Sequence, residues 1–252
     1  MSLHAWQTRL SDMLIVRAAG APVSLDRADR LNPQLSDSER DWLIRIETTP
    51  AFKFMCDVQR TWREFRVQTT APLTLSLLEP ARRQEVISAF ISRHPTSSIF
   101  FVSEAVPFLD VAAEMAADVP HVAELAAFER ARLLLGQALG SGDPIEGKGE
   151  LDPKRKVEVH PLACVVRFRA PADRVIAAAM RGLTPPPVED RDYWLLIAAR
   201  LPNLARASKI AEAHLFEVLR KTPAAAETFQ GDPPATAAMT TLWQAGALRV
   251  AG

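Results

Sequence analysis

Residues 162–169, Leu-Ala-Cys-Val-Val-Arg-Phe-Arg, decide the fold class of this chain. Leu162, Cys164, Val166 and Phe168 alternate with the residues between them, which is the two-residue period of a half-buried β-strand. Most of the apolar residues before position 140 follow instead the three-and-four spacing of α-helices. This change of period predicts an α+β protein, in which an N-terminal helical bundle precedes a small module with a short antiparallel sheet.

A segment rich in glycine, proline and charge, residues 141–156, separates the two patterns and is predicted to be a linker. The predicted domains are therefore 1–140 and 157–252. In the first domain the spacing predicts helices over 3–17, 37–47, 51–67, 82–92, 104–117 and 121–139, with a β-prone piece at 97–103. In the second it predicts strands over 162–169, 193–200, 204–210 and 247–250, and helices over 173–181, 211–221 and 234–245, with another short helix from Pro223.

Composition excludes several classes of protein. The 252 residues include 30 basic and 30 acidic ones. The chain therefore lacks the excess of basic residues that is typical of a dedicated nucleic-acid binder. Cys56 and Cys164 each lie in an apolar periodic stretch and are expected to be buried thiols. No run approaches the length of a membrane span and the N-terminus lacks the order of a signal peptide, so we expect a cytoplasmic protein.

The sequence contains no recognisable catalytic set. The five histidines are scattered, with no pair at helical spacing and no cysteine beside any of them. Nucleotide-binding and hydrolase motifs such as G-x-G-x-x-G, the Walker loop and G-x-S-x-G are also absent. We therefore expect neither catalytic residues nor a metal or cofactor in this chain, which would not be an enzyme by itself.

The predicted helix over residues 51–67 carries the most distinctive surface. Arg60, Arg63 and Arg66 lie within reach of Trp62 and Phe65, and arginine beside tryptophan is typical of interface centres. A partner-binding surface is one interpretation of this pattern. A solvated basic helix face is an equally simple alternative, and a phosphate-binding patch is a third.

The C-terminal module offers a second candidate site. A small sheet backed by helices leaves an open strand edge beside a helix groove, where an extended peptide can add itself through main-chain hydrogen bonds. A winged-helix DNA reader is the alternative for the same module. The predicted recognition helix, residues 234–245, contains no lysine or arginine, which favours a peptide over DNA.

Five segments, taken in order, resemble a known family. They are residues 59–64 (Gln-Arg-Thr-Trp-Arg-Glu), 98–105 (Ser-Ile-Phe-Phe-Val-Ser-Glu-Ala), 120–131 (Pro-His-Val-Ala-Glu-Leu-Ala-Ala-Phe-Glu-Arg-Ala), 159–161 (Val-His-Pro) and 242–248 (Leu-Trp-Gln-Ala-Gly-Ala-Leu). Their layout resembles the MbnC-like partner proteins of methanobactin biosynthesis and their wider HvfC/BufC-like relatives. The resemblance covers nearly the whole chain.

The resemblance implies a non-catalytic subunit of a heterodimer. Its partner would be an iron-containing TIM-barrel oxidase of the MbnB type, which converts cysteines of a ribosomal precursor peptide to oxazolone and thioamide groups, so the iron is expected in the partner. This chain would bind the precursor's leader as an added strand. Some wider relatives are described as DNA-binding, so a winged-helix regulatory protein remains the alternative.

The expected site residues fall into two groups. The expected partner-binding residues are Arg60, Trp62, Arg63, Arg66, Phe100 and Phe101. The expected peptide-binding residues are Tyr193, Leu195, Ile197, Leu248 and Val250. No membrane contact is expected.

Overall fold

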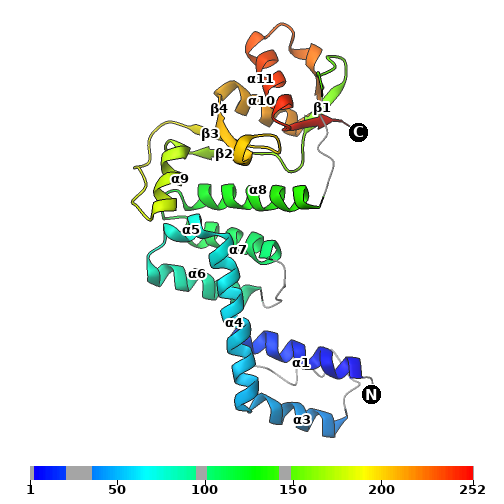
Figure 1. Cartoon of the computed structure of the whole chain (residues 1–252), viewed down its shortest axis with the longest axis vertical. Coiled ribbons are helices and arrows are strands. Elements are labelled where there is room, and N and C mark those ends of the chain that lie inside the picture. The colour runs from blue at the N-terminus through cyan, green and yellow to red at the C-terminus, as the bar shows by residue number, and fades with distance from the viewer. Residues whose placement is uncertain (1–2, 21–35, 95–100, 142–148, 252) are drawn as a thin grey trace. The chain divides into compact units, whose positions relative to one another are not determined.

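The computed structural model describes residues 3–20, 36–94, 101–141 and 149–251, and it has the α+β architecture that the sequence predicts. The chain divides into two compact units (Figure 1). Unit 1 comprises residues 1–70 and 80–111, and unit 2 comprises residues 71–79 and 112–252. This division differs from the predicted boundary at 141–156, because two helices that precede the linker belong to the same unit as the sheets.

Unit 1 is helical in its described part. It contains α1 (Leu3–Ala18), α3 (Asp37–Glu47), α4 (Pro50–Thr70), α6 (Pro80–Arg93) and most of α7 (Phe101–Met115). At the predicted start of α3, the Ser36 main-chain N–H donates to the Glu39 carboxylate over 2.8 Å, which satisfies an amide that the helix leaves unbonded. Met13, Leu43 and Phe52 are buried in a cluster that joins α1, α3 and α4.

The described part of unit 2 contains two three-stranded antiparallel sheets, A and B. Sheet A has the strand order β5-β1-β6, and sheet B has the order β2-β3-β4. The elements are α5 (Pro72–Ser76), α8 (Val122–Gly140), β1 (Lys156–Val159), β2 (Cys164–Phe168), α9 (Ala172–Arg181), β3 (Tyr193–Ile197), the 3₁₀ turn η1 (Pro202–Leu204), β4 (Ala205–Ser208), α10 (Ile210–Lys221), β5 (Ala224–Ala225), the 3₁₀ turn η2 (Ala226–Phe229), α11 (Pro233–Gln244) and β6 (Leu248–Val250).

Sheet B lies between two helical layers (Figure 1). One face places Val166, Phe168 and Ile197 in a core shared with α8 and α9. The opposite face contributes Leu196 to a second core, shared with α10 and α11. Burial on both faces explains why the sequence Tyr-Trp-Leu-Leu-Ile of β3 is continuously apolar instead of alternating.

Three sequence-based assignments are corrected. The short helix predicted from Pro223 is instead the strand β5 followed by the 3₁₀ turn η2. Residues 156–159, predicted to end the linker and begin the second domain, form the central strand β1 of a second sheet, which the sequence did not predict. The β-prone piece at 97–103 is helical where the structure describes it, because α7 begins at Phe101. Its remaining residues, 97–100, lie outside the described part.

Glu129 on α8 holds α5 within unit 2. Its carboxylate accepts hydrogen bonds from the main-chain N–H groups of Leu73 (2.8 Å) and Thr74 (2.9 Å), and from the Thr74 hydroxyl (2.6 Å). The two amides belong to the first turn of α5, where no intrahelical acceptor exists. Burial raises the pKa of Glu129, although the three hydrogen bonds act in the opposite direction. A single carboxylate therefore satisfies three buried donors.

We predict that Glu129→Ala lowers the free energy of unfolding by about 2–3 kcal/mol, because three donors lose their acceptor inside the protein. Urea unfolding followed by circular dichroism measures this change. The control is Glu124→Ala on the same helix, for which we expect a change within about 0.5 kcal/mol. Equal effects of the two substitutions would contradict this role for Glu129.

Candidate functional site

Strand β4 is an edge of sheet B, and its pairing shows which main-chain groups point outward. The Ala198 N–H donates to the Leu204 carbonyl over 3.0 Å, one residue beyond the Ile197–Ala205 pair that ends the β3–β4 ladder. Bonded and non-bonded pairs alternate along an antiparallel ladder, so the pairs formed by Ala205 and Ala207 are non-bonded ones. The main-chain groups of Ala205 and Ala207 therefore face away from β3, toward the open edge.

Part of this edge already has hydrogen-bond partners. The Ala205 N–H donates to the Pro202 carbonyl at the end of η1. The Ala207 carbonyl accepts from the Arg206 guanidinium over 2.7 Å. Within the described residues no partner is found for the Ala207 N–H or for the Ala205 carbonyl. One donor and one acceptor are thus available to an added strand.

A hollow of about 530 Å³ lies beside this edge. Its walls come from the start of α9, the first part of β3, the end of β4 and the start of α10; the lining residues include Asp173, Arg191, Tyr193, Trp194, Leu195, Ala207, Lys209 and Ile210. The volume lies within the usual range of ligand pockets, and the lining combines aromatic and aliphatic side chains with charged ones. An extended chain lying along β4 could therefore place side chains in this hollow.

The turn from β4 into α10 is held by Glu212. Its buried carboxylate accepts from the Arg206 guanidinium (2.8 Å), the Ser208 hydroxyl (3.0 Å) and the Lys209 main-chain N–H (3.2 Å). Burial alone would raise the pKa of Glu212, but these bonds outweigh it and the pKa lies below its ordinary value. Glu212 therefore stays ionised near neutral pH and fixes Arg206 on the edge strand.

The expected peptide-binding residues separate into two places. Tyr193, Leu195 and Ile197 lie in β3, which is paired on both sides and therefore cannot accept an added strand. Tyr193 and Leu195 nevertheless line the hollow beside β4, whereas Ile197 is core. Sequence reasoning did not identify Trp194, Ala207 and Ile210 as lining residues of the hollow. The only available signal was at Ile210, an apolar residue at the exposed start of a helix.

Leu248 and Val250 lie in β6, an edge strand of sheet A. The bonds from the His160 N–H to the Ala247 carbonyl (2.9 Å) and from the Ala251 N–H to the Lys156 carbonyl (3.0 Å) fix the ladder so that Leu248 and Val250 point their main-chain groups outward. The side chain of Leu248 is buried in the core. Strand β6 is thus a second, three-residue edge.

Unit 1 exposes a group of three aromatic side chains, which we call the aromatic cluster: Trp62 and Phe65 of α4, and Phe101 of α7. Their exposed fractions are 53%, 48% and 40%. The Trp62 and Phe65 ring centroids are 5.7 Å apart and those of Phe65 and Phe101 are 6.4 Å apart, both in edge-to-face geometry. Exposed aromatic groups of this kind are typical of protein interfaces.

Two of the arginines expected on this surface are buried instead. Arg63, 1% exposed, donates to the Glu104 carboxylate (3.2 Å) and to the carbonyl of His94 (2.6 Å), and its guanidinium lies 5.1 Å from the centroid of the Phe90 ring. Arg66 is also buried and reaches Glu104 over 3.5 Å. The prediction that Arg63 and Arg66 contact a partner at the surface is therefore corrected: both form ion pairs in the core, because they lie on the inward face of α4, whereas Trp62 lies on its outward face.

The other two expected partner-binding residues remain. Arg60 is partly exposed and pairs along the helix with Glu64 over 3.2 Å. Phe100 lies outside the described residues. The spacing of the buried residues Phe52, Cys56, Arg63 and Val67 could have indicated the inward face, but a charged residue at such a position is not recognisable as buried without its partner Glu104.

We predict that Arg63→Ala lowers the free energy of unfolding by about 3–5 kcal/mol, because it removes a partner of the buried Glu104 carboxylate and leaves a cavity. Trp62→Ala is expected to change it by less than about 1 kcal/mol, since half of that side chain is already in water. Urea unfolding of both variants checks the contrast. A stable Arg63→Ala protein would contradict the assignment of Arg63 to the core.

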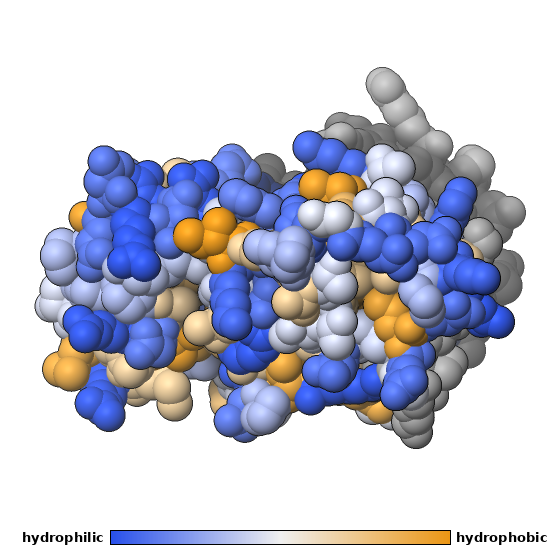
Figure 2. Space-filling view, turned by 90° about the horizontal axis from the view of Figure 1, so that it is seen from above, coloured by the Kyte–Doolittle hydropathy of each residue, from blue (hydrophilic) through white to orange (hydrophobic). Residues whose placement is uncertain are grey.

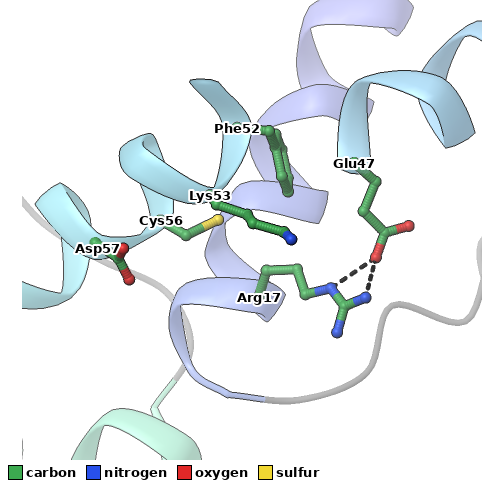
Figure 3. A pocket seen from close by; sticks show the side chains of 6 residues that line it. All are labelled: Arg17, Glu47, Phe52, Lys53, Cys56 and Asp57. Atoms are coloured by element: carbon green, nitrogen blue, oxygen red, sulfur yellow. Dashed lines mark hydrogen bonds and ion pairs between the residues drawn. The ribbon is translucent and has the colours of Figure 1, made fainter. Parts of the chain in front are cut away.

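A pocket of about 360 Å³ in unit 1 is lined by Arg17, Glu47, Phe52, Lys53, Cys56 and Asp57 (Figure 3). Arg17 and Glu47 bond to each other across it. Burial raises the pKa of the Cys56 thiol, which disfavours the reactive thiolate. The two cations and two carboxylates balance, so the pocket shows no preference for a charged ligand.

The described residues contain no group of three or more histidine, cysteine or acidic side chains placed to hold a metal ion. No helix in the described ranges has the length and apolar character needed to cross a membrane. On the face that Figure 2 shows, hydrophilic residues dominate and hydrophobic ones form small separate groups.

Neither the known protein-family models nor the curated proteins contain a match to this chain.

Proposed function

We propose that this chain is an accessory subunit that binds the leader of a ribosomal precursor peptide along the β4 edge and presents it to an iron-dependent TIM-barrel oxidase. The open edge beside an aromatic-lined hollow carries the peptide-binding part of this proposal. The sequence resemblance to MbnC-like proteins supports the oxidase and the methanobactin-type chemistry. In this proposal the reactive iron belongs to the partner.

The β4 edge suits an extended peptide for two reasons. The Ala207 N–H and the Ala205 carbonyl can bond to any peptide backbone, which gives affinity without sequence preference. Tyr193, Trp194 and Ile210 line the adjacent hollow, where an apolar side chain of the peptide would leave water. Because β4 has only four residues, the contacts in the hollow must contribute much of the affinity and all of the specificity.

We predict that Ala207→Pro abolishes binding of the leader peptide. Proline removes the outward N–H but no hydrogen bond to β3, because the Leu195–Ala207 pair is a non-bonded one. Calorimetric titration of the full chain with the precursor's leader peptide measures the effect.

Ala207→Ser, which keeps the N–H, is the matched control and should bind as the wild type does. If Val250→Pro on β6 abolished binding and Ala207→Pro did not, the peptide would lie on sheet A and this assignment would be wrong.

The aromatic cluster is the surface that we propose for docking the oxidase. Large aromatic side chains dominate the energetics of interface centres, because they bury much area at a small cost in side-chain entropy. The buried ion pairs of Arg63 and Arg66 with Glu104 join α4 to α7, the two helices that carry these rings. That support would hold Trp62, Phe65 and Phe101 in place before a partner arrives.

We predict that Trp62→Ala and Phe101→Ala each weaken co-purification with the oxidase by at least about tenfold, as expected for an interface centre. The chain offers a matched control in Trp42, which is 50% exposed on α3 and packs on Trp6 instead. Trp42→Ala should leave co-purification unchanged. Loss of the complex in all three variants would indicate general damage to unit 1, and loss in Trp42→Ala alone would place the interface on α3.

The observations favour a peptide over DNA for unit 2. Helix α11, Pro-Pro-Ala-Thr-Ala-Ala-Met-Thr-Thr-Leu-Trp-Gln, carries no basic residue for the phosphates or base edges of a duplex. Arg206, a basic residue of the edge strand, is already bonded to Glu212 and to the Ala207 carbonyl.

A further inference from the structure

Arg206 occupies a main-chain group that an added strand would use. Its Nη1 donates to the Ala207 carbonyl over 2.7 Å and also to the Glu212 carboxylate over 2.8 Å. The register of the β3–β4 ladder turns that carbonyl toward the open edge. The Arg206 side chain thus occupies the outward-facing carbonyl of the next residue in its own strand, Ala207.

The two contacts of the Arg206 guanidinium differ in their surroundings: the one with Glu212 is buried at the carboxylate, and the one with the Ala207 carbonyl is exposed. Glu212, which is 2% exposed, receives two further hydrogen bonds, from Ser208 and Lys209, so the carboxylate end of the contact is fixed. The Arg206 side chain is 29% exposed, and its bond to Ala207 lies on the solvent side of β4. A ligand approaching along the edge can therefore reach the carbonyl without disturbing the bond to Glu212.

We propose that Arg206 is a latch on the β4 edge, which a bound peptide must displace from the Ala207 carbonyl. This inference rests on the proposed function and describes the regulation of the same site. On binding, a peptide N–H takes the place of Nη1 at the carbonyl, while Nη1 keeps its bond to Glu212. The latch lowers affinity for short or poorly matched strands, because each ligand must first replace a charge-assisted hydrogen bond.

The same contact opposes strand pairing between two copies of the protein. An edge strand with all its donors and acceptors open invites pairing with another copy, and charged side chains on the edge are a common way to prevent this. The latch leaves the Ala207 N–H and the Ala205 carbonyl available but withholds the Ala207 carbonyl. A ligand that also fills the hollow can offset the loss of the latch, whereas an unspecific strand cannot.

The test removes the latch and measures peptide affinity. The probe is a synthetic peptide selected on the wild-type chain from a phage-displayed random library, and its dissociation constant is measured by fluorescence anisotropy with the full chain. Arg206→Met should bind it about two- to tenfold more tightly, which corresponds to one hydrogen bond no longer displaced. A purely structural role for Arg206 would weaken binding or leave it unchanged.

Two further variants make the result specific. Arg249→Met removes a strand arginine that pairs with Glu158 and bonds to no edge carbonyl among its described contacts, so its affinity should equal that of the wild type. Arg206→Met combined with Ala207→Pro should lose binding, which places the gain on β4. If Arg206→Met alone does not fold, Arg206→Met with Glu212→Gln removes both charges of the ion pair and is expected to show the same gain.

The outcomes separate the two proposals. If Ala207→Pro abolishes peptide binding but Arg206→Met does not increase the affinity, the latch proposal is wrong and the peptide site remains. Affinity that is indifferent to Ala207→Pro overturns the peptide site itself. If panning of both the wild type and Arg206→Met yields no binding peptide, both proposals are overturned.

Discussion

The pairing of β3 on both of its sides organises unit 2. Because β2 and β4 take all the main-chain groups of β3, its apolar side chains can be buried on both faces without leaving an unbonded amide inside the protein. Helices α8 and α9 cover one face, and α10 and α11 cover the other. The open main-chain groups of sheet B therefore lie on its edge strands β2 and β4, and on β4 Ala207 lines the hollow beside Arg206.

Three buried carboxylates are the second constraint, and each is matched by partners in the same unit. Glu129 receives three donors from α5, Glu104 receives two arginines from α4, and Glu212 receives one arginine with two further donors. Each contact adds a polar link between elements of the same unit. The buried charges therefore specify how elements are joined within a unit, while apolar burial drives their formation.

Sequence reasoning succeeded where a residue's own neighbours in the chain decide its structure. The long helices, the capping box at Ser36 and Glu39, and the strands β2, β3 and β4 follow from spacing and local chemistry, whereas the short helix α5 was not predicted. It failed for Arg63 and Arg66, because only Glu104, about forty residues away in the chain, makes their burial tolerable. It also missed β1, since a strand of four residues gains its stability from β5 and β6, which lie far along the chain.

The sequence by itself determined the α+β class, the order of the long helices and of strands β2, β3 and β4, and the absence of a recognisable catalytic motif, because periodicity and motif spacing are local properties. Tertiary structure alone decided which strand is an edge and which is central. Tyr193, Leu195 and Ile197 have the pattern of any apolar strand, but long-range pairing placed them in the middle of sheet B and left Ala205 and Ala207 at its border. A strand is an edge when no other strand pairs with one of its sides, and the residues of the strand itself do not determine this.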